Sequence, residues 1–175
     1  MPLSVPTTLV PFNGVSPRLV DQIACDLEGM GYDIRIEQTQ IPLTKAFNSR
    51  RKQYSADPIL NFVRRFSGQR VLGIMFDDIY RYVLDYVNGM ADLPGRAALV
   101  STCRLGEEQG DNPLVRKRLL ELSLHELGHT FGLEHCPTPR CAMYGGAATN
   151  GWLEPVVCYC ESCRKALTQK RNASY

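Results

Sequence analysis

The chain has 175 residues, of which 44% are hydrophobic and 22% are charged, as is typical of one globular domain with its own core. This composition excludes a disordered, collagen-like or coiled-coil protein. Twenty basic and eighteen acidic residues give a formal net charge of +2. That balance does not favour a nucleic acid or an anionic membrane surface as a partner.

The chain also lacks the patterns that direct proteins into or across membranes. Its longest apolar run covers residues 71–76, whereas a membrane-spanning helix needs about 20 residues. Residues 1–6 carry no positive charge ahead of an apolar run, so they do not resemble a signal peptide. We therefore expect a cytoplasmic protein, whose seven cysteines stay reduced and favour metal or redox chemistry over disulfides.

The first part of the chain predicts a strand, a helix and a second strand. Residues 4–12 favour a strand that contains two prolines. Ser16 and Pro17 are the N-cap and first-turn pair that often begins a helix, and apolar residues at helical spacing follow them. Residues 32–37 alternate between apolar and charged side chains, which indicates a half-exposed strand. The polar residues 44–56 then predict a loop.

The middle of the chain predicts a second helix, three strands and a long helix. A helix is expected over 57–68, followed by a buried strand at 71–76. Residues 81–90 and 96–105 are expected to form a pair of strands, and Asn112-Pro113 begins the longest helical pattern. This order predicts an α/β (mixed α+β) domain with a mixed, mostly parallel twisted sheet and helices packed on it.

All three histidines lie in one eleven-residue window, His125 to His135, which reads HELGHTFGLEH. The pattern H-E-x-x-H-x-x-G-x-x-H has chance odds of roughly a few per million in a chain of this length. On a helix, His125 and His129 lie one turn apart on the same face. A catalytic zinc site takes three protein ligands and leaves one position for water, so a third ligand is required.

His135 becomes the third ligand only if the helix ends before it. A straight helix would carry His135 about 15 Å beyond His125 along the axis. Gly132 allows a left-handed turn that ends the helix and folds the chain back. A β-branched residue in place of Gly132 is therefore expected to weaken zinc binding.

Glu126 follows His125 but points away from the ligand face, so it is not the first choice as a metal ligand. Its expected role is that of general base for a zinc-bound water, whose pKa the metal lowers to about 7. The activated water would attack a peptide carbonyl, and Glu126 would pass the proton to the leaving amine. The alternative is that Glu126 is an exposed helix carboxylate without a catalytic role.

Residues 125–163 resemble the archaemetzincins, a branch of the metzincin zinc metallopeptidases. The residues that carry this resemblance, besides the histidines, are Cys136, Cys141, Met143, Cys160 and Cys163, in the pattern C-x4-C-x-M followed by C-x2-C. The resemblance implies two zinc ions per chain, one catalytic and one structural, the latter held by the four cysteines. It also implies that Met143 forms the Met-turn beneath the catalytic zinc; otherwise Met143 is an ordinary core side chain.

The resemblance further implies that residues 1–175 form a single metallopeptidase domain. Residues 1–131 would supply the sheet and the helices up to the active-site helix, and residues 132–175 the Met-turn and the cysteine segment. One alternative concerns the cysteine ligands, because Cys158 lies two residues before Cys160 and could replace it. Sixteen residues separate Met143 from Cys160, one fewer than the family spacing. A C-x-x-C pair grips one metal through a tight turn, which favours Cys160.

Several other reactive residue types are expected to be structural. Cys25 in the first helix and Cys103 in a strand are expected to be small buried hydrophobes rather than redox groups. Asp77-Asp78 follow a buried strand and are expected to form a turn. The basic runs at 50–52 and 116–118 are expected to be solvated faces rather than a nucleic-acid site.

The sequence therefore predicts a zinc-dependent metallopeptidase that acts on a peptide or protein, with neither a nucleic acid nor a membrane as partner. The alternatives are a zinc-stabilised binding module and a peptidase-fold protein with little or no proteolytic activity. By the resemblance, a strand at the sheet edge holds the substrate, and residues 81–90 are the candidate. Tyr144 is a candidate for stabilising the oxyanion, although packing or solvent exposure also explains it. The cleavage specificity and the oligomeric state stay open.

Overall fold

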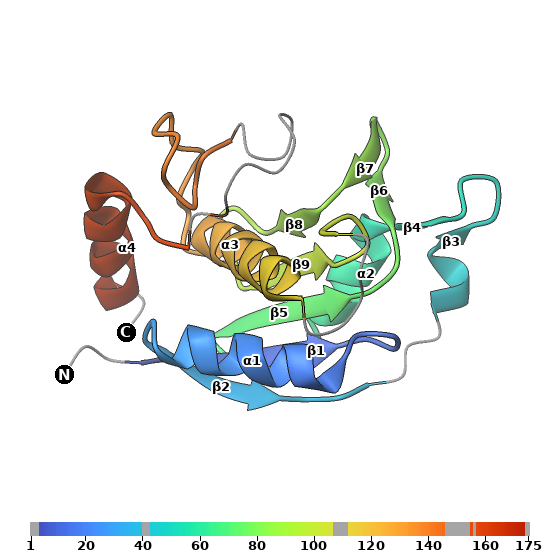
Figure 1. The fold of residues 1–175 in the computed structure, drawn as a ribbon, viewed down its shortest axis with the longest axis horizontal. Coiled ribbons are helices and arrows are strands. Elements are labelled where there is room, and N and C mark those ends of the chain that lie inside the picture. Colours follow the sequence, from blue (N-terminus) through green and yellow to red (C-terminus); the bar gives the residue numbers. More distant parts are fainter. Residues whose placement is uncertain (1–3, 40–42, 107–111, 146–154, 156, 174–175) are drawn as a thin grey trace.

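The chain folds into a five-stranded sheet with helices on both faces and a smaller four-stranded sheet beside it (Figure 1). This computed structural model describes residues 4–39, 43–106, 112–145, 155 and 157–173. The large sheet has the strand order β2-β1-β5-β9-β8. Its strands are β1 (Val5–Pro11), β2 (Tyr32–Ile36), β5 (Arg70–Met75), β8 (Gly89–Ala91) and β9 (Ala97–Ser101).

The remaining elements cover the large sheet or extend from it. The helices are α1 (Pro17–Glu28), α2 (Ala56–Val63), α3 (Pro113–Thr130) and α4 (Glu161–Ala173), together with a short 3-10 helix, η1 (Leu43–Lys45). The small sheet has the order β3-β4-β6-β7, with β3 (Phe47–Asn48), β4 (Gln53–Ser55), β6 (Ile79–Arg81) and β7 (Leu84–Val87). Among the described residues, no helix is long and apolar enough to cross a membrane.

The large sheet is mixed and mostly parallel, as predicted. Strands β2, β1, β5 and β9 are parallel, and only the edge strand β8 runs antiparallel to its neighbour. The side chain of Ser16 caps α1 by accepting a hydrogen bond from the backbone N–H of Leu19 at 3.5 Å. The antiparallel edge strand β8 lies alongside α3, the helix that carries the histidine window (Figure 1).

Alternating side chains of the central strands build two cores, one on each face of the sheet. Leu72 and Ile74 of β5 pack with α1 and α3, whereas Val71 and Met75 pack with α2 on the other face. Every residue of β5 is buried, which confirms the predicted central strand. The face that carries α1 and α3 therefore supports the helix with the histidine window.

The small sheet corrects two of the predicted elements. The predicted loop at 44–56 contains β3 and β4, and the predicted strand at 81–90 is divided into a β6–β7 hairpin and the separate strand β8. Strands of two or three residues are too short to display an alternating pattern, and β4 pairs with β6 across a long stretch of chain. Strand β9 also ends at Ser101, earlier than the predicted 105, and α2 ends at Val63 rather than at 68.

The prediction that Cys25 and Cys103 are buried is wrong. Both cysteines are exposed. Cys25 lies on the outer face of α1, because Ile23 and Leu27 take the inner positions of that helix. Cys103 lies in a turn that begins after β9 rather than in the strand itself.

Candidate active site and metal centres

Helix α3 presents two of the histidines and packs its apolar side chains into the core. Asn112 caps the helix by accepting a hydrogen bond from the backbone N–H of Leu114 at 2.9 Å, and Pro113 occupies the first turn. The buried apolar residues on the core face are Val115, Leu119, Leu120, Leu124 and Leu127. His125 and His129 instead line a cavity of about 810 Å³ between α3, the β7–β8 segment and the loop that follows α3.

Gly132 ends α3 and turns the chain back towards the histidines. It has a positive φ of 80°, a conformation that side chains disfavour. The N–H of Gly132 donates to the His129 carbonyl at 2.7 Å, and the N–H of Leu133 donates to the Gly128 carbonyl at 3.1 Å. This is a Schellman cap. The turn brings the ring of His135 to within 5.2 Å of the His125 ring and 5.0 Å of the His129 ring, measured between centroids.

Backbone carbonyls determine which nitrogens of His125 and His129 carry a proton. Nδ1 of His125 lies 2.8 Å from the Ala142 carbonyl, and Nδ1 of His129 lies 2.7 Å from the Leu133 carbonyl. A carbonyl only accepts hydrogen bonds, so each Nδ1 is the protonated donor and each Nε2 has a free lone pair. Burial lowers the pKa of His125 to about 4 and also lowers the pKa of His129, so both rings are neutral at pH 7.

The two free Nε2 atoms face each other at a separation of 3.0 Å. With both protons on Nδ1, no hydrogen bond joins these atoms, and a cation between them satisfies both lone pairs. Tetrahedral zinc with Zn–N bonds of about 2.0–2.1 Å places its nitrogens about 3.3 Å apart. The ligand nitrogens of His125, His129 and His135 all lie within 4.8 Å of one another. The three histidines therefore fit a zinc site with an open fourth position.

Glu126 is buried in the wall of the same cavity. Its side chain is 6% exposed, which excludes the alternative of an exposed helix carboxylate. Burial raises the pKa of Glu126 to about 8, and a cation held by the nearby histidines would lower it again and favour the carboxylate that a base needs. Its carboxyl group packs against Gly89, the first residue of the edge strand β8. The edge of the large sheet, the carboxyl group and the histidines therefore meet in one cleft.

Met143 lies on the loop that follows the histidine window and is fully buried. Its sulfur packs on α3 at Gly128, where a side chain would overlap it. The Met143 carbonyl accepts a hydrogen bond from the N–H of Cys136 at 2.7 Å, which ties the two ends of the loop together. This contact of Gly128 is not predicted from the sequence, although Gly128 lies inside the histidine motif. Tyr144, half-buried, follows Met143 and lines the cavity.

The four cysteines Cys136, Cys141, Cys160 and Cys163 form a second cluster, with all sulfur atoms within 4.8 Å of one another. The sulfurs of Cys136 and Cys160 are 3.8 Å apart. Tetrahedral zinc with Zn–S bonds of about 2.3 Å gives the same separation, about 3.8 Å. Hydrogen bonds from the Ser162 hydroxyl and from the backbone N–H of Cys163 lower the pKa of Cys160 to about 6, whereas burial raises the pKa values of Cys141 and Cys163. Holding all four sulfurs as thiolates would therefore need a cation among them.

Cys158 does not join this cluster. Its side chain is exposed. Its backbone carbonyl accepts a hydrogen bond from the N–H of Ala142 at 2.8 Å. The backbone N–H of Cys160 in turn donates to the sulfur of Cys141 at 3.3 Å. The segment around 158–160 therefore lies against the loop that also supplies the Ala142 carbonyl to His125.

Comparison with known proteins gives consistent matches across the chain. The profile of peptidase family M54 matches residues 18–169. The chain is 36% identical over 143 residues to the archaemetzincin of Pyrococcus abyssi, covering 74% of this chain and 73% of that one. It is 37% identical over 141 residues to the archaemetzincin of Methanopyrus kandleri, covering 77% of this chain and 79% of that one.

Solved structures show the same fold. The crystal structure of the Methanopyrus kandleri archaemetzincin matches with a TM-score of 0.80 and 30% identity, over 95% of this chain and 94% of that chain. The archaemetzincin of Archaeoglobus fulgidus, complexed with malonate, also gives a TM-score of 0.80, with 26% identity over 91% of this chain and 99% of that chain. Because the family match spans both the histidine window and the cysteine cluster, the chain belongs to peptidase family M54, the archaemetzincins, and is a zinc metallopeptidase.

Proposed function

We propose that this protein hydrolyses peptide bonds in the cleft between α3 and β8, with Glu126 as the general base. The observation that carries the proposal is the pair of unprotonated Nε2 atoms of His125 and His129, 3.0 Å apart, in one cavity with a buried carboxyl group. In this proposal His125, His129 and His135 hold a catalytic zinc. Zinc, when bound there, lowers the pKa of water and polarises the peptide carbonyl.

The other residues of the cleft have separate roles in the proposed reaction. Glu126 takes a proton from the attacking water and delivers it to the leaving amine. The carbonyls of Ala142 and Leu133 keep the two helix histidines in the required tautomer and orientation. Met143 supports these rings from below, and Tyr144 is a candidate for contacting the developing oxyanion, since it lines the same cavity.

The four cysteines are proposed to hold a second, structural zinc. Their sulfurs converge from a loop and from the region where α4 begins, and sulfur separations near that of a tetrahedral site support this role. We further propose that residues 1–175 act as one metallopeptidase domain, in which residues 132–175 join the cysteine site to the active-site helix. The reduced thiols that such a site needs also fit the predicted cytoplasmic location.

The test is a comparison of Glu126→Gln with wild-type protein on a peptide library. The variant should keep its zinc and its fold but lose about 10²–10⁴-fold in kcat, because it removes the base and no ligand. Glu134→Gln is the matched control, since Glu134 is an exposed carboxylate that lines the same cavity. Equal activity in Glu126→Gln and wild type would rule out the assignment of the base. A zinc-loaded wild type that cleaves no peptide would favour the non-proteolytic alternatives.

A further inference from the structure

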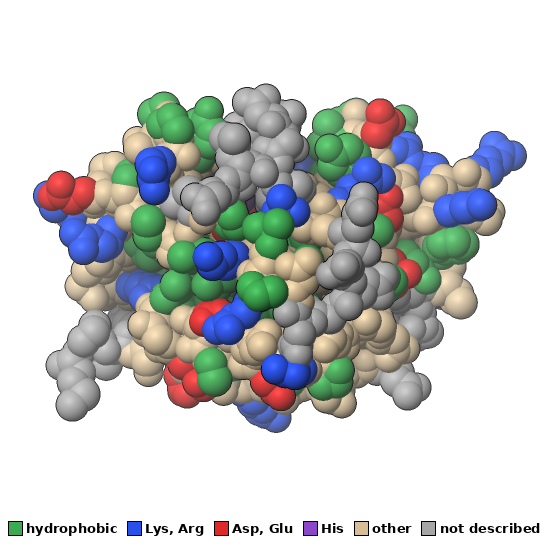
Figure 2. Space-filling model, in the orientation of Figure 1, with side chains coloured by type: hydrophobic (Ala, Val, Ile, Leu, Met, Phe, Trp, Pro, Cys, Tyr) green, Lys and Arg blue, Asp and Glu red, His purple; other side chains and the backbone are tan. Residues whose placement is uncertain are grey.

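The β6–β7 hairpin exposes apolar side chains at the rim of the cleft. Tyr82 and Val83 at its turn are 91% and 82% exposed, and Leu84 and Tyr86 of β7 are 49% and 40% exposed. Figure 2 shows hydrophobic side chains at the top of the molecule, where β6 and β7 lie in Figure 1. Leu84 and Tyr86 are alternate residues of one strand, and both line the histidine cavity. The hairpin therefore continues the cleft beyond the metal site.

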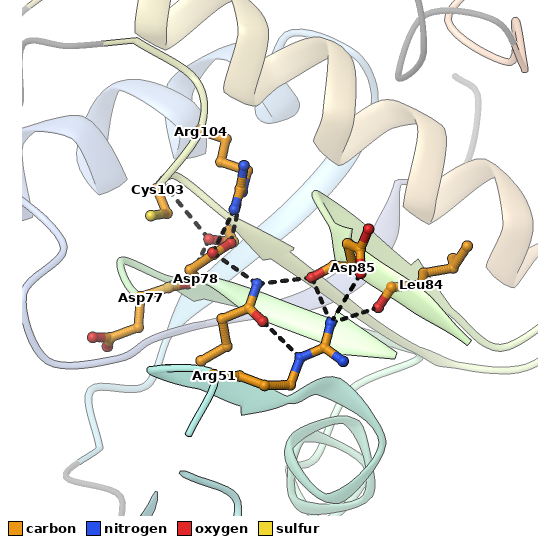
Figure 3. A network of polar contacts seen from close by, with 9 residues as sticks. Arg51, Asp77, Asp78, Leu84, Asp85, Cys103 and Arg104 are labelled. Carbon is orange, nitrogen blue, oxygen red and sulfur yellow. Dashed lines mark hydrogen bonds and ion pairs between the residues drawn. The ribbon is translucent and has the colours of Figure 1, made fainter. Parts of the chain in front are cut away.

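A network of polar contacts holds the backbone of β7 in place (Figure 3). The Arg51 guanidinium donates to the carbonyls of Leu84 and Asp85 at 3.1 and 2.9 Å. The buried Gln53 amide donates to the same Asp85 carbonyl and to the Asp78 carboxylate, each at 2.9 Å. Gln53 also accepts a hydrogen bond from Nε of Arg51 at 2.9 Å. Asp78, expected only to form a turn, thus anchors the hairpin to β4.

The same network orients the ring of Tyr86. Arg104 donates two hydrogen bonds to the Asp78 carboxylate, at 2.8 and 2.7 Å. Its guanidinium lies over the Tyr86 ring, 4.0 Å from the ring centroid. This stacking fixes one side of the ring, while Tyr86 still lines the cavity. The apolar rim is thus ordered before any ligand arrives, which lowers the entropic cost of binding.

The position of β7 along the chain indicates which part of a substrate would reach it. Strand β7 ends two residues before Gly89, which packs against Glu126 at the proposed reaction centre. Strand β8 is the edge of the large sheet and lines the cleft, so it can pair with an extended peptide. Antiparallel pairing, the commoner arrangement, directs the part of the peptide that follows the cleaved bond towards β7.

We propose that Leu84 and Tyr86 form a recognition surface for apolar side chains located about three to five residues after the cleaved bond. The spacing follows from the three and five residues that separate Gly89 from Tyr86 and Leu84 along the chain. The substrate class is therefore an extended peptide with an apolar segment on the C-terminal side of the bond. This inference rests on the proposed peptidase function.

The experiment uses pairs of peptides that differ only in carrying Leu or Ser at the third to fifth positions after the cleaved bond. Wild-type protein should cleave the Leu peptide with a KM about 5- to 10-fold lower than that of the Ser peptide, at similar kcat. Leu84→Ser should remove most of this preference by raising KM for the Leu peptide, with little effect on KM for the Ser peptide. Val83→Ser is the matched control, because Val83 is an exposed apolar residue of the same hairpin that does not line the cavity.

Binding separates a failure of this inference from a failure of the proposed activity. Fluorescence anisotropy with the Glu126→Gln protein measures the affinity for each peptide without cleavage, and Leu84→Ser in that background should weaken only the Leu peptide. Equal affinity for the two peptides, or an equal effect of Val83→Ser and Leu84→Ser, would overturn the recognition surface. Absence of cleavage by wild type together with the expected binding preference would overturn the peptidase mechanism and retain the surface.

Discussion

Gly89 and Glu126 occupy adjoining space in the cleft, although 36 residues lie between them in the sequence. A Cβ atom at position 89 would lie 2.5 Å from Oε1 of Glu126 and 2.8 Å from its Cδ, closer than non-bonded atoms approach. The edge strand therefore leaves room for the carboxyl group only because residue 89 has no side chain. The backbone of β8 at Gly89 therefore lies directly against the carboxyl group of Glu126, the proposed base.

Gly89→Ala is expected to displace Glu126 while leaving the three histidines that we propose as zinc ligands unchanged. A shift of about 1 Å in a reacting group costs on the order of 10²-fold in rate, so kcat should fall by that order with little change in KM. The measurement is steady-state kinetics together with zinc content, which should equal that of wild type. Gly29→Ala is the control, because a Cβ there has only ordinary contacts. A variant with normal kcat would show that Glu126 does not need this position.

The turn at Gly132 is expected to control the affinity of the histidine site. A side chain at this positive φ costs roughly 1–2 kcal/mol, and its Cβ would also approach Cβ of Pro94 to 3.3 Å. Gly132→Val should therefore weaken zinc binding by about 10-fold or more, as measured by titration with a competing chelator. Gly132→Asn should bind more tightly than Gly132→Val, since asparagine tolerates this conformation. Equal affinities in the two variants would contradict the role of the turn.

The histidine and cysteine sets are visible in the sequence because their members lie close together along the chain. Helical spacing relates His125 to His129, and one glycine explains the return of His135. Features that depend on distant pairing were not predictable in the same way. Strands β3 and β4 are too short for a hydrophobic pattern, and β4 is recognised as a strand only through its partner β6. Nothing near Gly89 in the sequence indicates a contact with Glu126.

The cysteines illustrate the same difference. The exposure of Cys25 follows from which face of α1 meets the sheet, and single-residue burial preferences cannot supply that information.

Asp78 is expected from the sequence to form a turn, but its role depends on Gln53 and Arg104, which come from two other parts of the chain. Candidate site residues that lie close together in the sequence were therefore easier to predict than the contacts from distant residues that orient them.

The ion pair between Asp78 and Arg104 is expected to make part of the stability depend on pH. Burial alone would raise the pKa of Asp78, but hydrogen bonds from Arg104 and Gln53 outweigh it and hold the pKa below its ordinary value. The stabilisation is therefore present above about pH 4 and is lost as the pH falls through the lower, folded-state value. Arg104 is partly exposed, so the contribution at pH 7 is about 1 kcal/mol.

Denaturant unfolding at several pH values tests this contribution. Asp78→Asn should lower the free energy of unfolding at pH 7 and have a progressively smaller effect as the pH falls below about 4. Asp33→Asn serves as a control on an exposed strand position and should show no such trend. An effect of Asp78→Asn that stays constant across this range would mean that the charge of Asp78 does not contribute.

The two metal sites are expected to depend on each other, because they share one loop. His135 and Cys136 are adjacent, the N–H of Cys136 bonds to the Met143 carbonyl at 2.7 Å, and the Ala142 carbonyl orients His125. Metal-bound cysteines would hold this loop in place, and their loss would free the Ala142 carbonyl that orients His125. Protein purified without chelator should accordingly contain two zinc ions per chain by mass-spectrometric metal analysis.

Replacing Cys160 and Cys163 by Ser should remove one zinc and also weaken the other, although no histidine is changed. Loss of groups that orient metal ligands commonly costs about 10- to 100-fold in metal affinity, which sets the effect to seek in a chelator titration of the remaining zinc. Cys158→Ser is the matched control and should retain both ions, because the Cys158 side chain is exposed and only its backbone is used. If the double variant stays folded and binds its remaining zinc as tightly as wild type, the two sites are independent. The cysteine site would then stabilise α4 alone, and the position of His135 would depend on the turn at Gly132.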